Sequence, residues 1–341
     1  MRGRFFLATL LGSMTALLAS LALLSPAAAD DFYKDKTLKI TIGFPPGGGF
    51  DTNARLLARY IGRYIPGHPD VIVVNAPGAA SATAVAHLEV NTPTDGTVIN
   101  EFNFGLLGAS LMEPEKTPFD FRRYAWIGSI AEDATICFVW RDNPPRSIAE
   151  MRGQHYLFGD AGAGSSEDLN TKILQRVFNL DIAEAKGYSG SAEVRLALER
   201  GEVQGMCGSW SSVPAEWLKS PKFHPLLRTS RSVPDGMAPE TPYILDLAPS
   251  DDARQIIRFL TGGGDLGRPF IASRAVPKDR IAILRQAFVA AVKDPGFLAE
   301  AKSQRLPVSP HTGEEAEKIV QQLYATPPAI IEAARKVAAE N

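Results

Sequence analysis

Strand-like segments alternate with helical segments through the first part of the chain, and this alternation limits the folds that the sequence can adopt. Residues 38–42 alternate apolar and polar side chains, as a half-buried strand does. Residues 71–74 are continuously apolar, which predicts a parallel strand covered on both faces. A third strand-like run covers residues 98–102, and segments with helical spacing separate the three. This βαβαβ order is the unit of a doubly wound sheet.

The same order returns in the middle of the chain. Strand-like runs cover residues 156–159, 183–188 and 203–207, and helical runs cover residues 167–178 and 192–199. The rest of the chain predicts a short returning strand at 267–272 and helices at 251–260, 278–293 and 314–340. We therefore expect an α/β protein with two lobes. Ligands of open α/β sheets bind at the carboxyl ends of the strands, where the turns of this chain are rich in small residues.

The turn after the first strand, Pro45-Pro46-Gly47-Gly48-Gly49, is the strongest local signal for binding. Its glycines let the backbone approach a ligand closely. Asp51 can cap the helix that follows. The start of that helix supplies unpaired N–H groups and a partial positive charge, which favour an anion such as a carboxylate. The alternative is an ordinary tight turn between a strand and a helix.

Two turns of the expected second lobe repeat this pattern. Ala161-Gly162-Ala163-Gly164-Ser165-Ser166 offers backbone N–H groups and two hydroxyls at a helix start, and Tyr188-Ser189-Gly190-Ser191 adds a phenol and further hydroxyls. Each turn alone is a common feature of α/β proteins. Three such turns, alternating with strands, favour a ligand cleft between the lobes.

Two aromatic rings bracket an amide directly after the third strand, in Phe102-Asn103-Phe104. The rings could give a pocket its shape, and Asn103 could hydrogen-bond a ligand. The other interpretation places Phe102 and Phe104 in the core and makes Asn103 a turn residue.

The N-terminus has the pattern of a secretory signal peptide. Arg2 and Arg4 precede an uncharged apolar run over residues 5–24, and Pro26 and the alanines 27–29 follow. We expect residues 1–29 to be removed by cleavage after Ala29, which would export the mature chain to the periplasm. The alternative is an uncleaved membrane anchor, since about 20 apolar residues can span a bilayer.

Composition and cysteine content exclude several kinds of site. The formal net charge is −2, and no basic segment stands out, so we expect no nucleic acid partner. Cys137 and Cys207 are the two cysteines of the chain. They form either a disulfide, which an oxidising compartment permits, or two buried thiols. Their spacing offers no metal site.

The sequence also lacks a catalytic constellation. Its five histidines are scattered, and a GxSxG motif is absent. Asp160, Glu167 and Asp168 lie close together in sequence, but acids are common at helix starts. We therefore predict that the chain is not an enzyme and that it needs no cofactor.

Several motifs together resemble those of the extracytoplasmic receptors of tripartite tricarboxylate transporters, the Bug or TctC-like family. They cover nearly the whole mature chain, in the order of the family: residues 46–55 (PGGGFDTNAR), 73–79 (VVNAPGA), 93–97 (PTDGT), 158–165 (FGDAGAGS) and 187–192 (GYSGSA).

This resemblance implies a type II periplasmic-binding-protein fold, with two lobes, a cleft between them and a carboxylated ligand held largely by backbone N–H groups and water. By position in the motifs, it implies ligand contacts for the following residues: Pro46, Gly47, Gly48, Asp51, Ala161, Gly164, Ser165, Tyr188 and Ser189. The chain departs from the family pattern at Ala76, at Ala80-Ser81 and at Gln204, so the identity of the ligand does not follow.

We therefore expect a monomeric receptor that binds a small carboxylate and delivers it to integral membrane transporter subunits. The ligand could be a di- or tricarboxylate, an aromatic acid or an amino acid. Residues 30–134 and about 236–341 would form the first lobe, and about 135–235 the second. The alternatives are a periplasmic α/β hydrolase or transferase, and a receptor that serves a sensor kinase.

Overall fold

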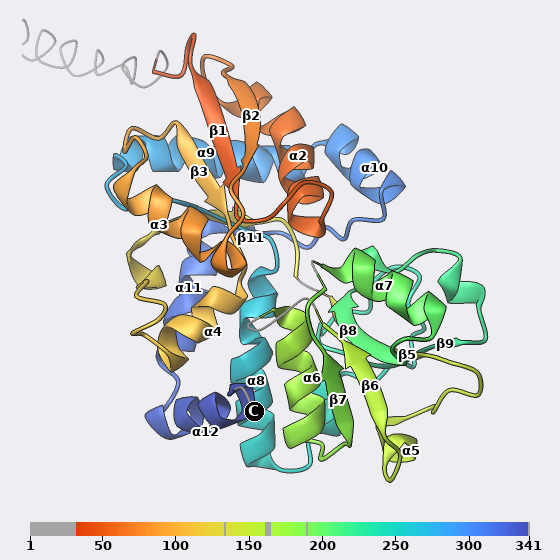
Figure 1. Ribbon diagram of the computed structural model, residues 1–341. Coiled ribbons are helices and arrows are strands. Elements are labelled where there is room, and N and C mark those ends of the chain that lie inside the picture. The colour runs from red at the N-terminus through yellow and green to blue at the C-terminus, as the bar shows by residue number, and fades with distance from the viewer. Residues whose placement is uncertain (1–31, 133, 161–164, 189, 340–341) are drawn as a thin grey trace, which may run out of the picture.

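The computed structural model describes residues 32–132, 134–160, 165–188 and 190–339. Six strands form its first sheet, in the order β11-β4-β10-β3-β1-β2 (Figure 1). Their bounds are β1 Thr37–Ile42, β2 Asp70–Asn75, β3 Val98–Glu101, β4 Ala125–Ser129, β10 Pro269–Ala272 and β11 His311–Thr312. β1 pairs parallel with β2 and β3, whereas β10 pairs antiparallel with β3 and β4. The predicted returning strand is therefore confirmed as β10.

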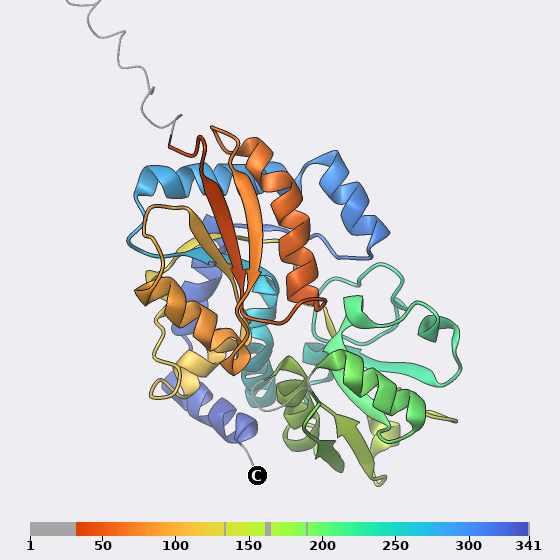
Figure 2. The same cartoon turned by 45° about the horizontal axis from the view of Figure 1, so that its top comes forward.

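Helices cover both faces of the first sheet. Val98 and Ile99 are adjacent in β3 and point to opposite faces, since they belong to different hydrophobic cores. One face carries α2 Gly49–Ile61, α9 Lys278–Val292 and α10 Pro295–Ser303. The other carries α3 Ala82–Val90, α4 Gly105–Met112 and α11 Gly313–Tyr324. Figure 2 shows α2 and α9 on one side of the strands.

The prediction that residues 71–74 lie in a strand covered on both faces was wrong. β2 is an edge strand of the sheet, and Ile72 and Val74 are exposed on its outer face. Val71 and Val73 pack against the core on the other face. An apolar run therefore does not separate a central strand from an edge strand when the outer face also carries β-branched residues.

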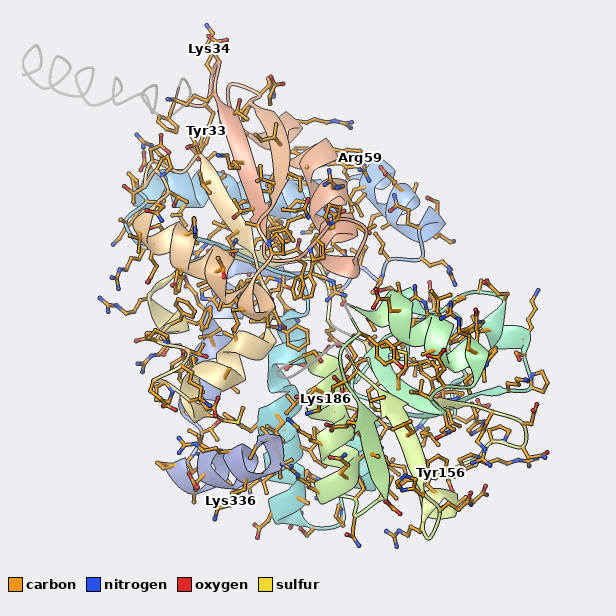
Figure 3. The ribbon with its side chains drawn as sticks, in the orientation of Figure 1. Tyr33, Lys34, Arg59, Tyr156, Lys186 and Lys336 are labelled. Carbon is orange, nitrogen blue, oxygen red and sulfur yellow. A yellow bond between two sulfur atoms is a disulfide. The ribbon has the colours of Figure 1, made fainter. Side chains whose placement is uncertain are left out.

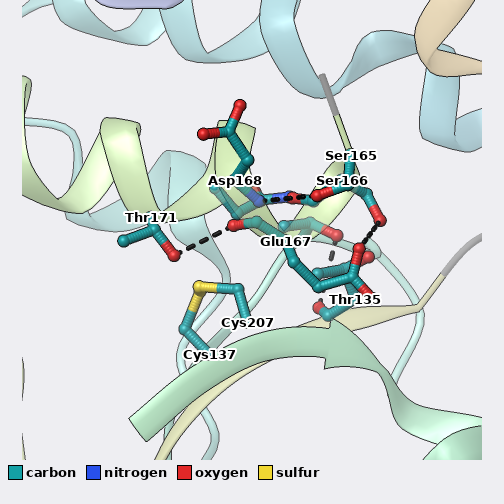
Figure 4. The surroundings of a disulfide bond; sticks show 10 residues. Thr135, Cys137, Ser165, Ser166, Glu167, Asp168, Thr171 and Cys207 are labelled. Carbon is teal, nitrogen blue, oxygen red and sulfur yellow. Dashed lines mark hydrogen bonds between the residues drawn. A yellow bond between two sulfur atoms is a disulfide. The ribbon is translucent and has the colours of Figure 1, made fainter. Parts of the chain in front are cut away.

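A second, five-stranded sheet has the order β7-β6-β8-β5-β9. Its strands are β5 Thr135–Trp140, β6 Tyr156–Gly159, β7 Ile182–Ala185, β8 Gly205–Ser209 and β9 Phe223–Arg228. Its helices are α5 Ile148–Met151, α6 Ser166–Arg176 and α7 Ser191–Arg200. Cys137 and Cys207 face each other across β5 and β8 and form a disulfide (Figure 4). Both cysteines are fully buried, so this bond lies in the core of the second sheet.

The helix α6 joins the second sheet to the last part of the chain. It packs against α8 (Asp251–Thr261) and α12 (Pro328–Ala338). Lys172 donates to the carbonyl oxygen of Ala338 at 3.0 Å, so a side chain of α6 caps the end of α12. Figure 3 labels Lys336 on α12, and its carbonyl oxygen accepts a hydrogen bond from Arg176.

The predicted helix 314–340 is in fact two helices. Pro327 and Pro328 interrupt it, because the proline nitrogen carries no hydrogen and cannot donate a hydrogen bond within a helix.

Short 3₁₀ helices lie between the longer elements. They are η1 Gly62–Tyr64, η2 Ala79–Ser81, η3 Phe121–Arg123, η4 Trp210–Ser212, η5 Trp217–Lys219, η6 Ile244–Leu247 and η7 Gly262–Leu266. Within the described ranges, no helix is both long enough and apolar enough to cross a membrane.

Candidate ligand-binding site

The predicted Gly-rich turn connects β1 to α2 and is held in shape by Asp51. Pro46, Gly47 and Gly48 are exposed, whereas Asp51 is buried. The Asp51 carboxylate accepts a hydrogen bond from the backbone N–H of Gly47 at 2.9 Å. It also accepts bonds from Arg55 at 3.0 Å and from the Asn75 amide at 2.9 Å. Asp51 therefore ties the turn, through Gly47, to Arg55 in α2 and to Asn75 at the end of β2.

The same contacts set the charge state of Asp51. Burial favours the neutral acid, but the hydrogen bonds from Arg55, Gly47 and Asn75 outweigh burial, so the pKa of the Asp51 carboxyl is lowered. Its negative charge is paired with Arg55 at 3.0 Å. The negative charge of Asp51 is therefore already compensated by its hydrogen bonds and by Arg55. An anion that approaches the turn meets the backbone N–H groups before it meets this carboxylate.

The start of α2 has no side-chain cap. Gly48 is the N-cap residue, with an extended backbone and no side-chain hydrogen bond. A Cβ placed on Gly48 would meet nothing within 4 Å, so the space in front of it is open. Gly47 has a φ of 89°, a conformation that favours glycine. The uncapped N–H groups of this first turn give the site an anion-binding character.

The turns after β2 and β3 meet beside the Gly-rich turn. Ser81 accepts a hydrogen bond from the Asn103 N–H at 2.7 Å, and a Cβ on Gly43 would collide with the Ser81 side chain. Ser81 is preceded by Ala79 and Ala80, and all three have left-handed backbones, with φ between 46° and 76°. This conformation costs roughly 1–2 kcal/mol for each non-glycine residue.

The structure places Phe102 in the core and Asn103 in a turn. Phe102 is fully buried and stacks on Phe121, with ring centroids 4.9 Å apart. The Asn103 side-chain oxygen accepts the N–H of Gly105 at 2.9 Å, near the start of α4. These contacts agree with the interpretation in which the aromatic residues belong to the core and Asn103 is a turn residue.

Turns of the second sheet converge at the start of α6. Ser165 caps this helix, because its hydroxyl accepts the N–H of Asp168 at 3.1 Å. Glu167 accepts the hydroxyl of Ser191, the first residue of α7, at 2.7 Å, which ties the two helix starts together. Figure 4 shows Ser165 and Glu167 close to the disulfide. Tyr188 is half-buried and approaches Gly159 at the end of β6.

Three predicted contacts, Ala161, Gly164 and Ser189, lie outside the described residues. The flanking residues Asp160 and Gly190 are described: Asp160 directly follows β6, and Gly190 is the N-cap residue of α7.

Sequence reasoning missed Arg268, which lies where the turns of the two sheets meet. Its side chain is buried, with 6% of the residue exposed. Its guanidinium stacks on the Phe50 ring at 4.6 Å, and a Cβ on Gly49 would lie 3.1 Å from Nη2. Nη2 also donates to the Ser209 hydroxyl at 3.3 Å, at the end of β8. Arg268 comes directly before β10, so its proximity to α2 depends on long-range strand pairing.

Glu101 is a second buried polar residue near the start of α2. It ends β3, where it pairs with Ile42 and Phe270, and it is fully buried. Neither carboxyl oxygen has a hydrogen-bond partner among the described residues. Burial raises the pKa of Glu101 well above its ordinary value, and nearby Asp51 adds to this effect, while Arg268 opposes it.

A buried cluster of charges lies behind the second-sheet turns. Asp160, Asp168 and Glu184 bring carboxylate oxygens within 4.8 Å of one another. Lys172 pairs with Asp168 at 3.0 Å, and Lys186 (labelled in Figure 3) pairs with Glu184 at 3.2 Å. Two ammonium groups thus balance most of the negative charge of the three carboxylates.

A groove of about 750 Å³ lies elsewhere, over α9 and β4. None of the predicted contacts lines it. Its lining includes both charged and apolar side chains, among them Arg123, Tyr124, Arg274, Val276, Lys278, Ile281, Arg285 and Val289.

Two α/β sheets of this topology, with loop turns that meet at their carboxyl ends, define the type II fold of periplasmic binding proteins. The fold predicted from the sequence is thus confirmed. Solved structures of such proteins align with almost the whole chain. A TctC solute binding protein from Polaromonas, without ligand, has a TM-score of 0.66 at 18% identity, over 89% of this chain and 99% of its own.

Two further structures contain acids. MatC from Rhodopseudomonas palustris, with bound malate, has a TM-score of 0.65 at 19% identity, over 89% of this chain and 99% of its own. A second R. palustris protein, with adipate, has a TM-score of 0.67 at 18% identity, over 89% of this chain and 97% of its own.

One curated protein is similar to this chain in sequence. A UPF0065 protein in the TAR-I ttuE-ttuC' intergenic region of Agrobacterium vitis is 23% identical over 224 residues, which are 64% of this chain and 63% of that protein. The chain therefore matches less than two thirds of this relative. No family model matches the chain. The resemblance predicted from the motifs is confirmed by this relative in sequence and by the solved structures in fold.

Proposed function

We propose that the chain is an extracytoplasmic receptor that binds a small carboxylate between its lobes and delivers it to a tripartite tricarboxylate-type membrane transporter. The uncapped start of α2 carries this proposal, because its N–H groups and open Gly48 can receive an anion. Proteins of the same fold hold malate and adipate, which supports a carboxylate as the ligand.

The lobes would close on the ligand and so create the surface that the transporter recognises. We propose residues 30–134 with about 236–341 as the first lobe, and about 135–235 as the second. A ligand that contacts both lobes binds the closed state more tightly and shifts the population toward it. Arg268 and Ser209 already join the two sheets by a hydrogen bond, which supports contact between the lobes at this point.

Residues 1–29 would act as a signal peptide that is cleaved after Ala29, so that the mature receptor is released in the periplasm. These residues lie outside the described ranges, and the proposal rests on their sequence. N-terminal sequencing of the exported protein tests it. A first residue of Asp30 is expected, and an intact Met1 would exclude cleavage.

A thermal-shift screen of the mature chain tests the proposed ligand class. The panel contains malate, adipate, citrate, aromatic acids and acidic amino acids, with their amides as neutral controls. At about 100 times its Kd, a true ligand stabilises the protein by about 2.7 kcal/mol, which raises Tm by about 4 °C for a chain of this length. If no carboxylate raises Tm, the proposed function is wrong.

Substitution of Gly48 tests the role of the turn. The backbone φ of Gly48 is −85° and its surroundings are open, so Gly48→Val should fold normally. Its branched side chain would block the N–H groups at the start of α2 and abolish binding, and Gly48→Ala should weaken binding less. Calorimetry measures the affinity, and unfolding of each variant controls for stability. Unchanged affinity in Gly48→Val would remove the turn from the site.

A further inference from the structure

We propose that Arg268 binds a carboxylate of the ligand directly, beside the start of α2, and that it makes the receptor selective for that charged group over its neutral amide. This assignment rests on the function proposed above and deepens it. It gives the site a charged side chain that reads the ligand, in addition to the backbone N–H groups of the Gly-rich turn.

The guanidinium of Arg268 is fixed at the start of α2 on several sides. Nη1 donates to the carbonyl oxygen of Gly267, and the cation lies on the face of the Phe50 ring, 4.6 Å from its centroid. The backbone N–H of Arg268 donates to Ser129, which anchors the residue to β4. Because these contacts hold the side chain in one orientation, little rotamer entropy remains to be lost when a ligand binds.

Gly49 lets Nη2 come close to the first turn of α2. A Cβ at this position would lie 3.1 Å from Nη2, a tighter contact than most Cβ atoms make. A carboxylate bound by the N–H groups at the start of α2 would therefore lie next to the guanidinium. Arginine offers a planar fork of donors that matches the two oxygens of a carboxylate.

Ser209 brings the second sheet to the same place. Its hydroxyl accepts a hydrogen bond from Nη2 at 3.3 Å, and it ends β8. A ligand held by Arg268 would thus be reached from both sheets. This geometry is the one that a receptor needs if its lobes are to close on a bound anion.

Glu101 supplies an independent sign of a polar site beneath the turn. Its carboxyl group is fully buried, without a hydrogen-bond partner among the described residues, at the end of the strand next to β1. The buried surroundings favour the neutral acid, so Glu101 does not compete as an anion with the ligand for Arg268. A neutral carboxyl could also donate a hydrogen bond.

A chemical double-mutant cycle tests the assignment. The affinities of wild type, Arg268→Gln and Arg268→Lys are measured by calorimetry for malate, for its two monoamides and for adipate. Loss of a charged hydrogen bond should weaken diacid binding by about 10- to 100-fold in Arg268→Gln. The monoamide that lacks the contacted carboxylate should bind wild type and variant within about 2-fold of each other. Arg268→Lys should lie between the two, since it keeps the charge and loses the fork.

Two further variants separate binding from folding. Gly49→Ala keeps Arg268 but displaces Nη2 by a few tenths of an ångström, so it should fold and still weaken diacid binding selectively. Arg285→Gln is the matched control, because Arg285 also donates to a backbone carbonyl, that of Trp126, but lies away from the turn. It should bind diacids like the wild type.

The outcomes separate this assignment from the proposed function. If the wild type binds no acid, the proposed function fails and the assignment fails with it. If the wild type binds diacids, and Arg268→Gln and Gly49→Ala bind them equally well, the assignment alone is wrong. An equal loss for diacids and for both monoamides would show that Arg268 only supports the shape of the site, which also overturns the assignment.

Discussion

The carboxylate of Asp51 accepts the backbone N–H of Gly47 at 2.9 Å. This bond folds the Gly-rich turn back onto the first turn of α2, and Arg55 and Asn75 hold the same carboxylate from the other side. Asp51 therefore organises the turn that we propose to bind the ligand. Its role is to position Gly47 and Gly48, whose backbone conformations shape the entrance to the helix.

Asp51→Asn should destabilise the chain by about 1–3 kcal/mol, because it removes the charge of a buried carboxylate that accepts hydrogen bonds from Gly47, Arg55 and Asn75. Ligand affinity should fall as well, since the turn loosens. Urea unfolding and calorimetry measure the two effects. If stability is unchanged and only affinity falls, Asp51 is a ligand contact instead.

The lowered pKa of Asp51 also predicts an acid dependence. A lowered pKa in the folded state stabilises the protein above the unfolded value of about 3.9, and this contribution is lost as pH falls through the lower, folded value. The stability difference between wild type and Asp51→Asn should therefore shrink in acid, below about pH 4. A difference that stays constant down to pH 2 would contradict this account.

Glu101 should show the opposite pH dependence. Its raised pKa means that the folded state keeps a proton that the unfolded state releases above about pH 4.3. Its contribution to stability is complete below that pH and is lost as pH rises toward the folded pKa. Glu101→Gln keeps a neutral group of similar shape, so it should raise Tm at pH 7 and have little effect below pH 4. A lower Tm at pH 7 would show that the ionised carboxylate is required.

Ala80→Gly should stabilise the chain by about 1 kcal/mol, because Ala80 has a left-handed backbone with φ of 48°, which costs glycine little. Ala86→Gly is the matched control in the interior of α3, where the same change should destabilise by up to about 1 kcal/mol. Thermal unfolding compares the two variants. Destabilisation by both substitutions would rule out strain at Ala80.

The Cys137–Cys207 disulfide should form when the chain is produced in an oxidising compartment and should contribute about 4 kcal/mol, the value expected for a closed loop with a sequence separation of 70. Denatured, unreduced protein should show no reactive thiol. The double variant Cys137→Ala with Cys207→Ala should unfold at lower urea concentration. Two reactive thiols per chain in the unreduced protein would contradict the bond.

Much of the fold could be predicted because the signals are local. Alternating and continuous apolar runs marked β1, β3 and β6, and the helical spacing of residues 278–293 marked α9 almost to its ends. The prediction was wrong for β2, because the local apolar pattern does not reveal the position of a strand within the sheet. The apolar run of β2 gave no sign that this strand lies at an edge, since exposure depends on whether another strand pairs beside it.

The site was less predictable for the same reason. Glycines in the turn before α2 indicated an anion site, because their effect on the backbone is local. The contribution of Arg268 depends on β10, which returns to the first sheet from about 170 residues further along the chain than β3. Nothing in the local sequence around Arg268 indicates that its guanidinium reaches Gly49 and Ser209.

A crystal structure of the mature chain with its best diacid tests the central claim most directly. We predict that a carboxylate oxygen of the ligand lies within about 3.2 Å of a backbone nitrogen at the start of α2, at Gly48 or Gly49. A ligand bound only elsewhere, for example in the groove over α9 and β4, with no carboxylate at the start of α2, would contradict it.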